Sequence, residues 1–250
     1  TNEQMKQQWE TLGSYSFSSN SEKEKILNRL SPGALQAMAA ELKKLQLNMG
    51  PVKSTIRNLL DRSISYFSSK EKPYFVNILD ADSLDGLQDH ELLHPKLRKF
   101  SIDDVMVKQS RKIGKIDIYV DVSGSMQEGA GGGIEKIAFA KAFLLQMKEM
   151  DLIDNLYSFA GNIRKQDNEL LDILSLHANG GTDLESVVKD IERKSKNAIV
   201  LTDAGDRVNT YSSSAFFIGV RGADFRNFDP AAMEKYADYA QAVLFDGSSI

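Results

Sequence analysis

The chain has 250 residues, and its composition is that of a globular protein. Hydrophobic residues make up 42% of the sequence and charged residues 26%, which are ordinary proportions for a globular domain. No stretch approaches the ~20 apolar residues needed to cross a bilayer. The net charge is −4, and no dense basic face predicts nucleic-acid binding. Cysteine is absent, which excludes disulfides and thiolate chemistry.

No targeting signal is recognised in the sequence as given, which starts at Thr1 and does not exclude a removed leader. The first 30 residues contain no apolar signal-peptide core, and no lipidation motif is present. The lack of cysteine fits a reducing compartment, so we expect a cytoplasmic protein that does not bind membranes. Charge is unevenly spread, with a net of +3 over residues 1–112 and −7 over residues 113–250. The acidic second part therefore favours a cation over a polyanion as its partner.

The N-terminal part of the chain has the pattern of amphipathic helices. Ser21 followed by Glu24 forms a capping-box pattern, and Ser31-Pro32 starts a second helix that should stop at Gly50. A third apolar stripe runs through residues 52–64. We therefore predict a helical region over residues 1–70 and a connector with short helices over residues 71–112.

From residue 113 onward, strands and helices alternate. The predicted strands are 116–121, 155–159, 163–166, 198–203, 215–220 and 242–245, and the predicted helices are 134–150, 170–176, 183–193 and 230–240. Most strands lack polar alternation, so both of their faces should be covered by helices. A turn at 160–162 makes the second and third strands a hairpin. The sequence predicts an α/β fold with a doubly wound, mainly parallel sheet and one antiparallel edge, preceded by the smaller all-α region.

Oxygen-bearing side chains gather where three of these segments end or begin. Asp121, Ser123 and Ser125 follow the first strand, "NGGTD" (179–183) precedes a helix, and Asp203 closes a later strand. Ligands of such sheets bind beyond the carboxyl ends of the strands, so we expect these loops to converge. Mg²⁺ prefers oxygen ligands in near-octahedral order. The glycine-rich "EGAGGGIEK" (128–136) is expected to leave the rim of this site open and mobile.

These three segments resemble the metal-ion-dependent adhesion site of the von Willebrand factor A (VWA) domain, through D-x-S-G-S, G-G-T-D and T-D in that order. The resemblance covers residues 113–250. It implies that Ser123 and Ser125 bind Mg²⁺ (or Mn²⁺ or Ca²⁺) directly, Thr182 directly or through water, and Asp121 and Asp203 largely through water. It also implies that a partner protein supplies an Asp or Glu to the metal. The expected rim consists of Gly124, Gly180, Gly181 and Asp183.

A second resemblance concerns the arrangement of the whole chain. A helical region before such a domain is similar to the intracellular VWA proteins that partner MoxR-type AAA+ ATPases, and "GGTDLESVVKDIE" (180–192) resembles their second motif. The implied function is a binding module, not an enzyme, with an AAA+ ATPase as a further partner.

Enzymatic alternatives remain open from the residues alone. "HELLH" places His90, Glu91 and His94 in the H-E-x-x-H pattern of zinc proteases. Pro95 disfavours helical geometry at His94, and a third ligand would have to be an acid such as Asp103. A phosphatase with Asp121 as nucleophile is the other alternative, although Ser123 replaces the second acid of that pattern. The glycine run lacks the Gly-Lys-Ser/Thr ending of a P-loop.

Overall fold

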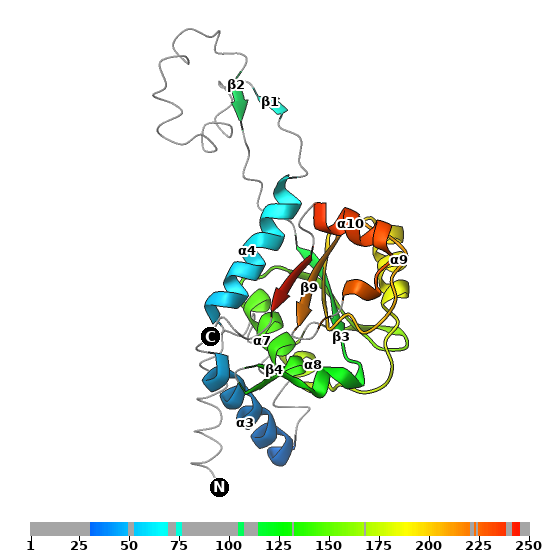
Figure 1. The fold of residues 1–250 in the computed structure, drawn as a ribbon. Coiled ribbons are helices and arrows are strands. Elements are labelled where there is room, and N and C mark those ends of the chain that lie inside the picture. The colour runs from blue at the N-terminus through cyan, green and yellow to red at the C-terminus, as the bar shows by residue number, and fades with distance from the viewer. Residues whose placement is uncertain are drawn as a thin grey trace. The chain divides into compact units, whose positions relative to one another are not determined.

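The structure is a computed structural model that describes residues 31–49, 53–69, 74–76, 105–107, 115–131, 133–167, 169–220, 223, 225–238 and 242–245 (Figure 1). It divides into two compact units, residues 1–63 with 115–250, and residues 64–114. In the second unit, β1 (Tyr74–Val76) pairs with β2 (Val105–Val107) in antiparallel orientation. The domain boundaries predicted near residues 70 and 112 stay a prediction.

Two of the predicted N-terminal helices are present, α3 (Pro32–Met49) and α4 (Lys53–Ser69). Ser31 begins α3 by accepting a hydrogen bond from the amide of Ala34 at 3.3 Å, so the helix has the expected Ser-Pro start. The apolar stripe of α3 is buried along its length, at Leu35, Met38, Leu42 and Leu45. The helix predicted from Ser21 and the short helices predicted in the connector lie outside the described residues.

A six-stranded sheet forms the centre of the first unit, in the order β10-β9-β8-β3-β6-β7. Its strands are β3 (Ile116–Asp121), β6 (Ile153–Phe159), β7 (Ile163–Gln166), β8 (Ala198–Thr202), β9 (Ala215–Val220) and β10 (Ala242–Phe245). All neighbours are parallel except β7, which runs antiparallel to β6 at the edge. The predicted fold class is therefore confirmed.

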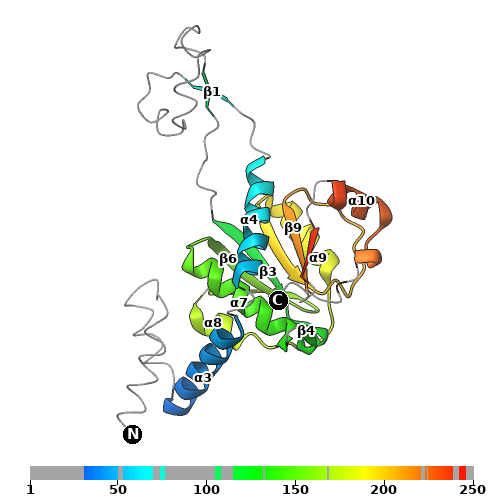
Figure 2. The same ribbon diagram turned by 60° about the vertical axis from the view of Figure 1, so that its left-hand side comes forward.

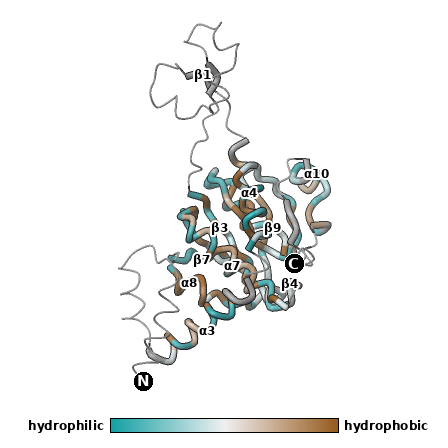
Figure 3. Tube along the Cα trace, turned by 90° about the vertical axis from the view of Figure 1, so that its left-hand side faces the viewer, coloured by the Kyte–Doolittle hydropathy of each residue, from teal (hydrophilic) through white to brown (hydrophobic). Residues whose placement is uncertain are grey.

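Helices cover both faces of this sheet, which explains why its central strands are apolar on both sides (Figures 1 and 2). One face holds α7 (Lys136–Glu149) and α8 (Leu170–Ser175), and the other holds α9 (Leu184–Lys194). The helix α10 (Pro230–Asp238) contributes to the core on the α9 side. Every residue of β3, β8 and β9 is buried. The helix α7 is buried nearly all round and coloured as hydrophobic over much of its length (Figure 3).

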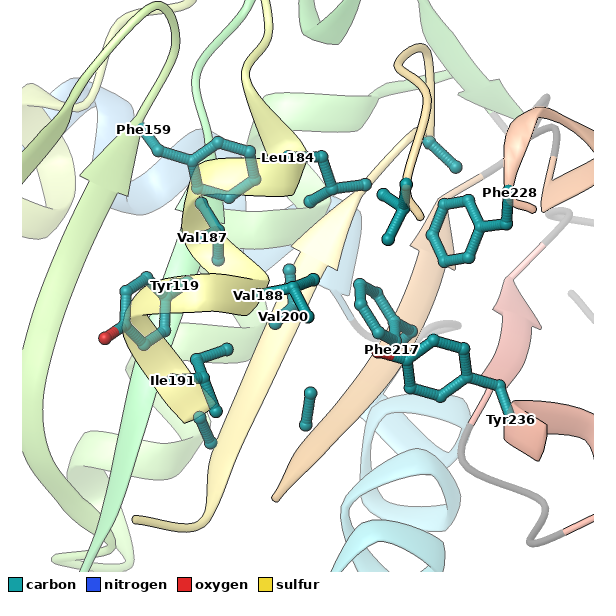
Figure 4. Close-up of a cluster of buried hydrophobic side chains, with 14 of the residues drawn as sticks. Tyr119, Phe159, Leu184, Val187, Val188, Ile191, Val200, Phe217, Phe228 and Tyr236 are labelled. Carbon is teal, nitrogen blue, oxygen red and sulfur yellow. The ribbon is translucent and has the colours of Figure 1, made fainter. Parts of the chain in front are cut away.

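The α9 face of the sheet carries an aromatic and aliphatic core. Leu184, Val187, Val188 and Ile191 of α9 pack on residues that point from the central strands. Figure 4 shows this cluster extending from Phe159 to Phe228 and Tyr236. The buried face of α9 thereby fixes the loop that precedes the helix, which contains Thr182.

The glycine-rich segment differs from its prediction. It forms a small hairpin of β4 (Gly129–Gly131) and β5 (Ile134–Glu135), and α7 begins only at Lys136 rather than at Ile134. Ala130 and Ile134 are buried, so the segment gains apolar contacts that an open loop would lack. Gly133 has φ +76°, a turn conformation that residues with a side chain rarely adopt.

Among the described helices, none is long and apolar enough to cross a membrane.

Candidate metal site

The first loop of the candidate site begins where β3 ends. Asp121 is fully buried, and its Oδ1 accepts a hydrogen bond from the Ser123 amide at 2.8 Å. The chain then turns into a short 3-10 helix, η1 (Gly124–Gln127). The Ser123 and Ser125 hydroxyl oxygens lie 3.1 Å apart. Alternate positions after the strand thus place both hydroxyls together, as the sequence predicted.

The second loop is attached to the first by backbone hydrogen bonds. The Asn179 amide donates to the Val122 carbonyl at 2.6 Å, and the Gly124 amide donates to the Gly180 carbonyl at 3.0 Å. Gly180 has φ +92°, which makes glycine necessary there. A Cβ added at Gly124 would meet the Gly180 carbonyl at 3.5 Å, an ordinary contact, so glycine is not needed at that position for close approach. Thr182 follows Gly180 by two residues and is half-buried.

The third loop reaches Asp121 through the threonine of the T-D motif, which was not predicted to be a site residue. Thr202, at the end of β8, is fully buried and donates its hydroxyl proton to Asp121 Oδ2 at 2.6 Å. Its oxygen accepts from the Ala204 amide at 3.0 Å. Asp203 follows directly and is 4% exposed. The structure therefore joins all three predicted segments, and Asp121 is the common partner of the first and third.

A buried lysine was missed entirely. Lys136 at the start of α7 is 5% exposed, and its Nζ donates to Asp203 Oδ2 at 3.0 Å and to Glu128 Oε2 at 2.9 Å. Burial lowers the pKa of Lys136, but the two carboxylate partners outweigh burial and raise it overall. Asp203 and Lys136 are 67 positions apart in the sequence, so no local pattern could have paired them.

The donor atoms fit a hard cation such as Mg²⁺. Asp203 Oδ1 is buried and has no hydrogen-bond partner, a costly state that a cation would relieve. Burial raises the pKa of Asp121 to about 6, the charge of Asp203 adds to this, and the bonds from Thr202 and Ser123 oppose it. The residues expected to hold the ion stay those predicted from the sequence, Asp121, Ser123, Ser125, Thr182 and Asp203.

The type of donor matters for which metal could bind. Within the part of the chain that the structure describes, no three His, Cys, Asp or Glu side chains form a metal-binding group. A metal at this site would therefore rely on hydroxyl oxygens beside two carboxylates. Such a set suits Mg²⁺ far better than zinc, which favours nitrogen and sulfur ligands.

The predicted rim is only partly available to a partner. Asp183 caps α9, because Oδ1 accepts from the Ser186 amide at 3.0 Å and Oδ2 from the Ser186 hydroxyl at 2.6 Å. Both of its oxygens are thus engaged within the helix start. Gly124, Gly180 and Gly181 are exposed, so they could border a docked side chain.

The described geometry gives no support to the zinc-protease and phosphatase alternatives. His90, Glu91, His94 and Asp103 lie outside the described residues. Asp121 is 0% exposed and both of its oxygens accept hydrogen bonds. A carboxylate held in this way is poorly placed to attack a phosphorus atom.

Comparison with known proteins finds likeness to solved structures only at the level of the fold. No protein-family model matches the chain, and no curated protein matches it. Among solved structures, the chain is similar to a von Willebrand factor type A protein from Catenulispora acidiphila, with 20% sequence identity and a TM-score of 0.36. The match covers 52% of this chain and 38% of the length of that one. A likeness at this level carries no information on function.

Proposed function

We propose that residues 113–250 form a VWA-type, Mg²⁺-dependent protein-binding module without enzymatic activity. The observation that carries this proposal is that Asp121 accepts hydrogen bonds from the Ser123 amide of the first loop and from the Thr202 hydroxyl at the start of the third. It is supported by Asp203 Oδ1, which is buried without a hydrogen-bond partner, because a bound cation would satisfy this oxygen. The cytoplasmic location and the absence of membrane and nucleic-acid partners stay predictions.

The partner in this proposal presents an Asp or Glu side chain. Ser123, Ser125 and Thr182 are neutral ligands, so an ion held mainly by them keeps a strong attraction for one more anionic oxygen. The bound metal would supply the positive charge to which a partner carboxylate binds. This chain contributes the preorganised hydroxyls, the buried Asp121 that orients the first loop, and the exposed glycines that leave room beside the site.

Metal-dependent melting tests this function. Mg²⁺ should raise the melting temperature of the wild-type protein by mass action, because the unfolded chain cannot assemble these oxygens. The Asp121→Ala variant should show no such rise. Equal shifts in both proteins would reject the site, whereas stoichiometric zinc that depends on His90 would favour the protease alternative instead.

We further propose that the helical region docks a MoxR-type AAA+ ATPase while the metal site grips a client. The support is the order of the two regions in the chain and the resemblance of residues 180–192 to that group. A purified ATPase of this type should then bind the full chain equally with and without a chelator. Binding that disappears with chelator would place the ATPase at the metal site, and no binding would reject the adaptor role.

A further inference from the structure

We propose that the Lys136 ammonium competes with the cation of the candidate metal site for the Asp203 carboxylate. Each of the two binds Asp203 less tightly when the other is present. This inference rests on the proposed function and concerns how the site is regulated. Lys136 ends the glycine-rich segment 128–136, and no motif predicted that its side chain would reach the site. Its Nζ nevertheless lies 3.0 Å from one oxygen of Asp203, and the other oxygen of that carboxylate has no partner.

The two partners of Lys136 differ in their exposure to solvent. The side chain of Asp203 is 4% exposed, and that of Glu128 is 70% exposed. The pair with Asp203 is therefore poorly screened, while the pair with Glu128 is largely solvated. Glu128 offers the ammonium an outer position when a cation takes Asp203.

The backbone keeps this ammonium near the site in either case. The Lys136 amide donates to the Glu128 carbonyl at 2.9 Å, and the hairpin of β4 and β5 closes the segment between the two residues. Lys136 is also the first residue of α7, whose buried length is fixed against the sheet. The positive charge cannot withdraw far, so a divalent ion always meets repulsion from it.

The consequence is a site with weakened affinity for free metal. Two negative charges, at Asp121 and Asp203, face one built-in positive charge before any ion arrives. A partner carboxylate would restore the missing negative charge. Metal and partner should therefore bind cooperatively, each raising the affinity of the other.

Replacing the lysine by an uncharged side chain of similar length tests the inference. Mg²⁺ binding is measured by calorimetry on wild type, Lys136→Met and the control Lys141→Met. Lys141 lies on the same helix and is similarly buried, but it pairs with Glu41. We expect Lys136→Met to bind Mg²⁺ about tenfold more tightly than wild type, because a nearby like charge is removed, and Lys141→Met to match wild type.

The outcomes separate this inference from the proposed function. Equal affinities in wild type and Lys136→Met would overturn the competition but leave the metal site standing. Absence of Mg²⁺ binding in all three proteins would overturn both. Mg²⁺ binding that appears only in Lys136→Met would support the competition in its strongest form.

A second pair of variants decides the matter even where Lys136→Met fails to fold. Glu128→Gln removes the outer partner of the ammonium, so Lys136 should hold Asp203 more strongly and Mg²⁺ affinity should fall. Glu135→Gln removes another exposed negative charge, from the neighbouring strand β5, and serves as the control. A clearly larger loss in Glu128→Gln supports the competition, and equal losses contradict it.

Discussion

Two threonines near the candidate site differ in burial, which separates a structural role for one from the proposed ligand role of the other. Thr202 is fully buried and bonded on both sides, to Asp121 and to the Ala204 amide. Thr182 is half-buried in the loop before α9. Thr202 holds the site together, and Thr182 keeps its proposed role as a ligand of the ion.

Threonine-to-valine replacements at both positions test that assignment. Thr202→Val leaves Asp121 Oδ2 and the Ala204 amide without their partner, which should lower the free energy of unfolding by about 1–3 kcal/mol. Thr182→Val should weaken Mg²⁺ binding while changing the free energy of unfolding by less than about 0.5 kcal/mol. Denaturant titration and calorimetry measure the two quantities. The reverse pattern would mean that the roles are exchanged.

The buried carboxyl of Asp121 should make metal-free stability depend on pH. Its pKa of about 6 lies above the 3.8 of the unfolded chain, so the folded protein retains a proton that the unfolded chain has lost. The contribution favours folding at about pH 4 and is lost as the pH rises to about 6, by roughly 2–3 kcal/mol. The metal-free Asp121→Asn variant should lack this part of the decline when its free energy of unfolding is measured by denaturant titration at a series of pH values. An unchanged decline in the variant would contradict it.

Much of the site could be predicted from sequence, and the missing part has a physical reason. Asp121, Ser123 and Ser125 follow an apolar strand at alternate positions, a local pattern that can be recognised from the sequence alone. Thr202 looks like an ordinary strand residue because its role depends on an acid 81 positions away. Lys136 is hidden for the same reason, since a long side chain reaches across the sheet edge to Asp203.

At the scale of elements, one glutamate fixes the loop after β8 to the helix α9. Glu185 accepts hydrogen bonds from the Asn209 amide at 2.7 Å and from the Thr210 hydroxyl at 2.6 Å. Burial alone would raise the pKa of Glu185, but these bonds and Lys189 lower it to about 2. The loop that begins at Asp203 is thereby tied to the helix that follows Thr182.

Removing this charge should weaken the fold in a pH-dependent way. Because the folded pKa lies below that of the unfolded chain, the stabilisation is present above about pH 4.5 and is lost as the pH falls toward 2. Glu185→Gln should cost about 1–2 kcal/mol at pH 7, allowing for its partial exposure. The exposed Glu192→Gln on the same helix is the control. Equal unfolding curves for the two variants at pH 7 would refute this role.

The elements themselves were predictable where apolar patterns are long. The strands β3, β8 and β9 and the edge hairpin of β6 with β7 appear at the predicted places, because buried parallel strands are continuous apolar runs. The hairpin of β4 and β5 was not predicted. Glycine-rich segments have few side chains to form a pattern, and the burial of Ala130 and Ile134 adds to the backbone pairing that holds this one.

At the scale of the whole molecule, a partly buried ion pair connects helix α3 to the helix layer that covers one face of the sheet. Lys141 of α7 pairs with Glu41 of α3, and its Nζ also donates to the Leu174 carbonyl in α8 at 2.8 Å. Because α3 packs against both α7 and α8, this part of the helical region shares a core with the α/β domain.

Hydrogen exchange on Lys141→Met tests this connection. The variant loses the pair with Glu41 and leaves the Leu174 carbonyl without its donor, at a cost of about 1–3 kcal/mol. Amide hydrogens of α3 should exchange faster than in the wild type, while those of β3 should stay as protected relative to one another as they are in the wild type. Unchanged exchange in α3 would show that apolar packing alone holds this helix in place.

The central claim is that three loops distant in sequence surround one hard cation. Manganese broadening of amide resonances in the ¹⁵N-labelled full chain tests it most directly, because Mn²⁺ can replace Mg²⁺ and quenches signals only near itself. We predict that amides of residues 122–125, 180–183 and 203–205 broaden together at low Mn²⁺ and recover with excess Mg²⁺. Broadening confined to one of these segments, or scattered over exposed carboxylates elsewhere, would contradict the account.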